Sequence, residues 1–142
     1  MEHSIEVLAV PASISNLMAF SDAAERELPL TIEQGYFLRL AIEEIATNLI
    51  KYGYAHMLPG PIQVCCAYEH GRLRLVLRDR GRPFDPREAP PPDLSGDIRS
   101  RAVGGLGIFL VRQLADELLY HHDAASGWNE LVVLKGAEDG VA

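Results

Sequence analysis

The sequence predicts an α+β protein, a two-layer sandwich in which helices pack on one face of a mixed, mainly antiparallel sheet. Strand patterns come as two adjacent pairs, at 62–77 and 117–135, and each pair encloses a short polar turn. Three segments between and before them have helical patterns: 13–27, 32–52 and 105–116. Hydrophobic residues make up 48% of the 142-residue chain, enough for a buried core. We therefore expect residues 1–142 to form one domain.

The first two elements are a strand and a helix. Residues Ser4–Val10 alternate loosely and indicate an edge strand that ends at Pro11. Ser13–Glu27 is expected to be helical, and Pro29 ends it because proline cannot continue a helix. The apolar stripe of this helix comprises Leu17, Met18, Ala24 and Leu28.

The second helix has the clearest boundaries. Thr31 and Gln34 form a Thr-x-x-Gln capping box, which is typical of a helix start. We expect this helix to run from about Ile32 to Tyr52, with Gly53 as a natural stop. Four residues recur at helical spacing and should face the core: Leu38, Ile42, Ile45 and Leu49.

The remaining strands are expected to form two hairpins. His70-Gly71 suits a tight turn between alternating runs at 62–68 and 73–77. After a helix at Gly105–Asp116, Glu117–His122 and Asn129–Lys135 close the domain as a second hairpin. His121 and His122 are expected to be exposed or packing residues.

Residues 81–104 differ in kind from the rest of the chain. Gly, Pro, Asp, Ser and Arg dominate there, and no periodicity survives. A long irregular segment inside a compact domain is usually functional or disordered. We expect residues 86–103 to form a lid that closes over a ligand.

Charge and cysteine content exclude several classes of function. The formal net charge of -7 argues against direct nucleic-acid binding, which needs clustered Lys and Arg. Cys65 and Cys66 are adjacent, so a disulfide between them is implausible, and free cysteines suit a reducing cytoplasm. The N-terminal apolar run is too short for a signal peptide, and no run approaches 18 apolar residues. We expect a cytoplasmic protein with no membrane partner.

The first candidate functional pair is Glu44 and Asn48. Residues four apart lie on one face of a helix, here at the margin of the apolar stripe. An amide oxygen is a suitable ligand for Mg²⁺, and a carboxylate one turn earlier could orient or deprotonate an attacking hydroxyl. A solvated helix face with one asparagine remains the plain alternative.

Two glycine-containing motifs add to this pair. Asp79 ends a strand and is followed by Gly81, so a carboxylate could accept a hydrogen bond from an exocyclic amine beside a close backbone approach. Gly104, Gly105 and Gly107 run into an apolar helix, whose free N–H groups form an anion site. An ordinary Asp-x-Gly turn and a flexible loop end are the alternatives.

In this order the motifs resemble those of the GHKL (histidine-kinase-like) ATPase superfamily, in the pattern of the anti-sigma-factor serine/threonine kinases of bacteria. AIEEIATNLIKYGY resembles the N box, DRGRPFDP the G1 box and RAVGGLGIFLVRQLADEL the G2 box. GWNELVVLK resembles the family's last strand. The resemblance extends from about Ile5 to Lys135, with Tyr52 standing where many of these kinases have His.

The resemblance implies ATP and Mg²⁺ as cofactors. Glu44 would be the catalytic base, Asn48 would bind Mg²⁺, and Asp79 would accept a hydrogen bond from the adenine amino group. The other nucleotide-binding positions would be Gly81 and Pro83 near the base, and Lys51, Gly104, Gly105, Leu106 and Gly107 near the phosphates. Arg101 would reach the terminal phosphate from the lid, with Arg99 as a competitor for that role.

The resemblance further implies a protein serine/threonine kinase that phosphorylates an anti-sigma antagonist protein of the STAS type and can sequester a sigma factor, as a homodimer or partner-bound. Two other hypotheses stay open. One is an ATP-dependent protein-binding module without phosphotransfer, which would have no need of Glu44. The other is a stand-alone catalytic domain of a histidine-kinase system, which the absence of an H box disfavours.

Overall fold

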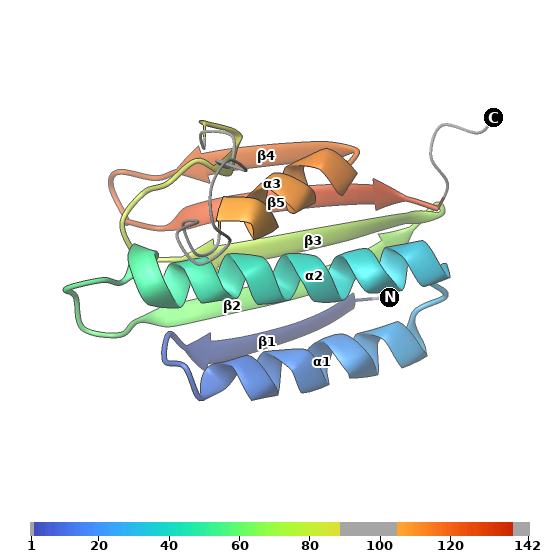
Figure 1. Cartoon of the computed structure of the whole chain (residues 1–142), viewed down its shortest axis with the longest axis horizontal. Coiled ribbons are helices and arrows are strands. Elements are labelled where there is room, and N and C mark those ends of the chain that lie inside the picture. The colour runs from blue at the N-terminus through green and yellow to red at the C-terminus, as the bar shows by residue number, and fades with distance from the viewer. Residues whose placement is uncertain (1, 89–104, 138–142) are drawn as a thin grey trace, which may run out of the picture.

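The computed structural model of the chain describes residues 2–88 and 105–137. Its elements in chain order are β1 (Glu2–Leu8), α1 (Ser13–Glu27), α2 (Ile32–Asn48), the π-helical turn η1 (Leu49–Gly53), β2 (Pro61–Glu69), β3 (Arg72–Asp79), the 3-10 turn η2 (Pro86–Glu88), α3 (Gly105–Leu114), β4 (Glu117–His122) and β5 (Asn129–Gly136). Figure 1 shows the three α-helices lying on one face of the sheet, which confirms the predicted two-layer α+β fold.

The sheet has five strands in the order β1-β2-β3-β5-β4. It was expected to be mixed, but every pairing among these strands is antiparallel. β1 lies at one edge as predicted, although it spans Glu2–Leu8 instead of Ser4–Val10. The shift arises because β1 pairs with β2 from Glu2 opposite Ala67 to Leu8 opposite Pro61, where β2 begins.

The predicted start of α2 is confirmed in detail. The Thr31 hydroxyl accepts a hydrogen bond from the Gln34 N–H at 3.1 Å, and the Gln34 side-chain oxygen accepts one from the Thr31 N–H at 3.0 Å. The side-chain nitrogen of the buried Gln34 also donates to the carbonyl oxygens of Gly71 and Lys135, each at 3.0 Å. Gln34 therefore ties this helix start to the β2–β3 turn and to the end of β5.

The helical segment that begins at Ile32 ends at Gly53, within one residue of the predicted end at Tyr52, but its last turn is not α-helical as expected. The α-helix ends at Asn48 and continues as the wider π turn Leu49–Gly53, which the Tyr54 N–H closes by donating to the Leu49 carbonyl at 2.9 Å. The helix widens where the Tyr54 side chain enters the core with only 5% of its surface exposed. Single π turns inside α-helices often occur at functional sites.

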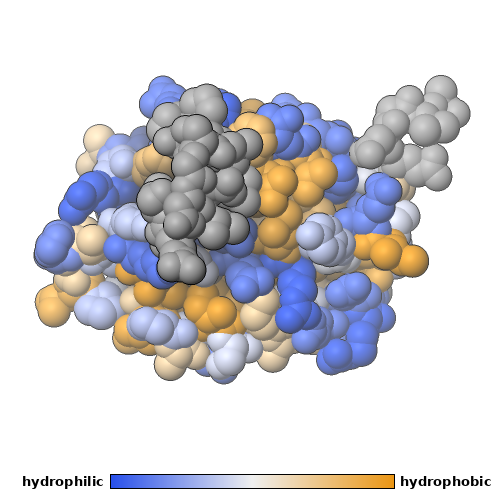
Figure 2. Space-filling model, in the orientation of Figure 1, coloured by the Kyte–Doolittle hydropathy of each residue, from blue (hydrophilic) through white to orange (hydrophobic). Residues whose placement is uncertain are grey.

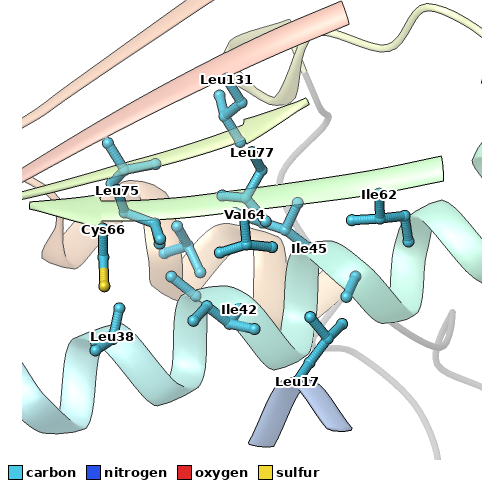
Figure 3. Close-up of a cluster of buried hydrophobic side chains, with 14 of the residues drawn as sticks. Leu17, Leu38, Ile42, Ile45, Ile62, Val64, Cys66, Leu75, Leu77 and Leu131 are labelled. Carbon is cyan, nitrogen blue, oxygen red and sulfur yellow. The ribbon is translucent and has the colours of Figure 1, made fainter. Parts of the chain in front are cut away.

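The core lies between α2 and the sheet. In Figure 3, Leu38, Ile42 and Ile45 of α2 face apolar side chains of β2 and β3. Each fully buried side chain of this kind contributes about 1.5–3 kcal/mol. Leu49, expected in the same stripe, is only partly buried and lies in the π turn, where it packs against the edge of the core.

Both predicted hairpins form. His70 and Gly71 have φ values of 53° and 77°, as a tight turn between β2 and β3 requires. α3 was expected to reach Asp116 but ends at Leu114, whose carbonyl accepts a hydrogen bond from the Lys135 ammonium group at 2.8 Å. The Asp116 N–H already pairs with the Leu134 carbonyl of β5 at 2.9 Å.

Most of the predicted lid, residues 89–103, lies outside the described residues, and so do Arg99, Arg101 and Gly104. Within the described part of 81–104, Pro86–Glu88 forms a short 3-10 turn where no structure was expected.

Figure 2 shows apolar side chains gathered over α3, where Leu110 and Leu114 are each 37% exposed. None of the described helices is long and apolar enough to cross a membrane.

Candidate functional site

The predicted site residues come from three segments of the fold. Asp79 is the last residue of β3, Glu44 and Asn48 lie in the last two turns of α2, and Gly107 lies in the first turn of α3. α2 packs against α3, and the end of β3 pairs with the start of β5, Asp79 being opposite Asn129.

Asp79 is a buried carboxylate with 7% of its surface exposed. Its Oδ1 accepts hydrogen bonds from the Gly81 N–H at 2.8 Å and from the Asn129 side-chain nitrogen at 3.0 Å. Among the described residues no hydrogen bond falls on Oδ2. Burial raises the pKa of Asp79, although Asn129, Gly81 and the charge of His122 act in the opposite direction. One oxygen is thus held by the protein, and the other can accept from a ligand.

The turn after Asp79 is bound to the π turn by its backbone. The Arg80 N–H donates to the Tyr54 hydroxyl at 2.7 Å, and the Arg82 N–H donates to the Gly53 carbonyl at 2.7 Å. A Cβ on Gly81 would lie 2.7 Å from the Gly53 carbonyl oxygen, so only glycine fits here. The close backbone approach predicted at Gly81 is therefore made by the Gly53 backbone of the protein itself. Pro83, the next predicted position along, is exposed.

Glu44 and Gly107 meet although they lie far apart in the sequence. A Cβ added to Gly107 would overlap the carboxylate of Glu44, so glycine allows the start of α3 to approach this side chain. Asn48, one turn further along α2, has a buried side-chain nitrogen that finds no hydrogen-bond partner among residues 2–88 and 105–137. A buried donor that is left unpaired is costly, and such groups often mark a place where a ligand binds.

The electrostatic environment of Glu44 favours a proton acceptor. Burial is the main cause that raises the pKa of this carboxyl, and the neighbouring charge of Glu43 adds to it. The charge of Lys51 acts in the opposite direction. A carboxylate with a raised pKa holds a proton more strongly than an exposed glutamate does. Lys51 and Tyr52 themselves are exposed in the π turn.

The first turn of α3 contains Gly105, Leu106 and Gly107. The first four N–H groups of a helix lack partners within the helix, and the helix dipole adds positive potential there. This end of α3 therefore suits an anion, and Glu44 lies beside it. Within residues 2–88 and 105–137, no cluster of three or more His, Cys, Asp or Glu side chains could hold a metal ion.

Four residues that lie around Asp79 in the structure were not predicted as site residues. They are Tyr54, Asn129, Tyr120 and His122, which form a connected set of hydrogen bonds with the turn after β3. His122 was expected to be exposed or a packing residue, yet its Nδ1 lies 2.7 Å from the Asn129 side-chain oxygen. The sequence does offer a signal for three of them: Tyr120, His122 and Asn129 place polar groups at inward-facing positions of the paired strands β4 and β5.

The chain is similar to proteins of known family. Residues 7–135 match the family described as "Histidine kinase-like ATPase domain". The chain is 30% identical over 90 residues to the serine-protein kinase RsbW of Listeria monocytogenes serovar 1/2a, an alignment that covers 61% of this chain and 57% of the relative. It is 29% identical over 90 residues to the serine-protein kinase RsbW of Bacillus thuringiensis (strain Al Hakam), covering 61% and 56%.

The chain thus spans little more than half the length of these relatives, 57% and 56%. The family match is broader, since it runs from the end of β1 to the end of β5. It includes α2, the turn after β3 and the start of α3, which are the segments that build the site. The chain therefore belongs to the histidine kinase-like ATPase domain family.

Proposed function

We propose that the chain is an ATP-dependent protein serine/threonine kinase whose acceptor is an anti-sigma antagonist protein of the STAS type, and that it also sequesters a sigma factor. The printed name of the relatives, serine-protein kinase, supports the reaction class. The observation that carries the proposal is the contact between the Glu44 carboxylate and Gly107 at the start of α3, one helical turn from Asn48.

The residues around Asp79 fit the adenine base of ATP. The exocyclic amine of adenine is a hydrogen-bond donor, and Oδ2 of Asp79 is the acceptor that the protein leaves available. A hydrogen bond to a charged acceptor contributes about 1.5–3 kcal/mol. Gly81 contributes to this arrangement through its N–H, which occupies Oδ1 of Asp79.

The start of α3 and the face of α2 fit the phosphates and Mg²⁺. The N–H groups of Gly105, Leu106 and Gly107 point from a helix start, which attracts anions. Asn48 would offer its amide oxygen to Mg²⁺, an ion that prefers oxygen ligands and retains water. When bound, Mg²⁺ offsets the negative charge of the phosphates. Lys51, exposed in the π turn, adds a cation on this side.

Glu44 would accept the proton of the acceptor hydroxyl. As the serine oxygen forms a bond to the terminal phosphorus, the bond from that phosphorus to the bridging oxygen breaks and ADP leaves. The raised pKa of Glu44 suits this proton transfer. Loss of such a base typically slows a reaction by about 10²- to 10⁴-fold.

The test is incubation of the protein with labelled ATP, Mg²⁺ and a candidate antagonist protein, followed by identification of phosphoserine by mass spectrometry. Glu44→Gln should remove most of the phosphotransfer and leave ATP affinity nearly unchanged. Glu33→Gln, an exposed glutamate at the opposite end of α2, is the matched control and should act like the wild type. If Glu44→Gln phosphorylates at the wild-type rate, the kinase assignment is wrong and an ATP-dependent binding module explains the site better.

A further inference from the structure

The Asn129 side chain is the centre of the hydrogen bonds behind Asp79. It lies at the start of β5 and is 2% exposed. Its nitrogen donates to Asp79 Oδ1 at 3.0 Å and to the Gly81 carbonyl at 2.9 Å. Its oxygen accepts from the Tyr120 hydroxyl at 3.1 Å and lies 2.7 Å from the His122 Nδ1. These four contacts use both ends of the amide.

Tyr120 and His122 determine which end of this amide faces Asp79. The oxygen and nitrogen ends of an asparagine amide have nearly the same shape, so hydrogen-bond partners decide its orientation. In the flipped orientation the amide oxygen would face two other acceptors, Asp79 Oδ1 and the Gly81 carbonyl. The Tyr120 hydroxyl on β4 disfavours this because it donates to the amide oxygen, and the tautomer of His122 with its proton on Nδ1 adds a second donor.

The Tyr120 hydroxyl is itself held in place. It accepts a hydrogen bond from the Phe84 N–H at 3.1 Å, so its own proton is directed to Asn129. A continuous chain of donors therefore leads from the backbone after Pro83, through Tyr120 and Asn129, to Asp79 Oδ1. Each donor in this chain helps to keep Oδ1 occupied, which leaves Oδ2 as the carboxylate oxygen without a donor among the described residues.

We propose that the β4–β5 hairpin sets the base selectivity of the nucleotide site, with Asn129 as a positioning residue that Tyr120 and His122 orient. By holding Asp79 through Oδ1, Asn129 presents Oδ2 to a purine with an amino group at position 6. A purine with an oxygen at that position would place an acceptor against the carboxylate. The inference rests on the proposed function in taking ATP as the ligand, and adds what makes the site select adenine.

Calorimetry with three nucleotides tests this role: ATP, ITP and the triphosphate of purine riboside, which lacks the 6-amino group. Asn129→Asp keeps the shape of the side chain and removes the donors to Asp79. It should weaken ATP binding by roughly tenfold or more, since hydrogen bonds to charged groups are the strong ones. Affinity for purine riboside triphosphate should change little, so the preference for the amino group collapses.

Tyr120→Phe and His122→Phe serve as milder variants, because they leave Asn129 in place and remove one donor each. Each should reduce the preference for ATP by roughly two- to tenfold. His121→Phe is the matched control, since His121 is the exposed neighbour on the opposite side of β4, and it should bind like the wild type. Thermal unfolding of every variant verifies that it is folded.

The outcomes are distinguishable. Folded variants that keep the full preference for ATP, or that lose all three nucleotides in equal proportion, overturn the positioning role while the proposed ATP-binding function stands. A folded wild-type protein that binds none of the three nucleotides overturns the proposed function, and the inference with it.

Discussion

The contact between Gly107 and Glu44 allows the proposed catalysis to be tested separately from stability with a single added methyl group. In Gly107→Ala, the new Cβ would overlap the carboxylate of Glu44 and lie 2.7 Å from its Cγ, closer than real Cβ atoms come to other atoms. The overlapped atoms belong to the free end of a flexible side chain on another helix, so we expect the carboxylate to swing away while the backbone stays.

The expected effects on rate and stability have different sizes and directions. A misplacement of about 1 Å in a reacting group can slow a reaction by about 10²-fold, or about 2.7 kcal/mol in the barrier. Alanine is favoured over glycine in a helix by up to about 1 kcal/mol, which would raise the unfolding temperature by about 2–4 °C. Gly107→Ala should therefore phosphorylate its partner protein about 10²-fold more slowly and unfold at the same or a higher temperature.

Gly35→Ala is the matched control. At this position of α2 a Cβ would lie 2.5 Å from an oxygen of Glu25, a similar overlap with the end of a glutamate, but Glu25 is exposed on α1 outside the site. Both variants should gain helix stability, and only Gly107→Ala should lose phosphotransfer. Equal rates for the two variants would refute the reasoning. Adding Glu44→Gln to Gly107→Ala should cause little further loss, because both changes disable the same group.

Three further predictions follow from the site and its supports. Asp79→Asn keeps an acceptor for Gly81 and Asn129 but removes the charge that burial disfavours. Because the pKa of Asp79 is raised, stability is lost as the pH rises through that pKa, so the variant should unfold at the same or a higher temperature at neutral pH. Its ATP affinity, measured by calorimetry, should fall at least roughly tenfold. A lower unfolding temperature would contradict this. The rate of phosphotransfer should fall as the pH is lowered through the raised pKa of Glu44, because only the ionised carboxylate can accept a proton. If the rate falls only near the ordinary glutamate pKa of about 4.3, Glu44 is not the base. Tyr54→Phe leaves the Arg80 N–H and the Pro61 carbonyl without their 2.7 Å partner and should lower the free energy of unfolding in urea by about 1–3 kcal/mol; an unchanged midpoint would show that the turn is held by other contacts.

Local signals predicted most of the elements. α1 spans Ser13–Glu27 as expected, because its apolar residues recur at helical spacing and Pro29 ends it. The capping box of Thr31 and Gln34 determines the start of α2 through contacts three residues apart. Gly53 likewise indicated where the helical segment ends, but the π form of its last turn could not be predicted in this way, since this turn accompanies the burial of Tyr54 against segments that come later in the chain.

The site was only partly predictable for the same reason. The spacing of Glu44 and Asn48 follows from helical geometry, and Asp79 and Gly81 are close in sequence. The bond between Asn129 and Asp79 joins residues 50 apart, and the contact between Glu44 and Gly107 depends on how α3 docks on α2. Such proximity is a property of the packed layers, which no local pattern contains.

The buried side chain of Gln34 has a consequence for the order in which the chain can fold. It bonds the Gly71 carbonyl, 37 residues away, and the Lys135 carbonyl, 101 residues away. During synthesis from the N-terminus, α2 is complete long before β5 has been made, so this amide must remain hydrated until the last strand arrives. The helix that carries Glu44 and Asn48 would then become fully anchored only when β5 enters the sheet, and a nascent chain that stops short of β5 should hold this helix loosely.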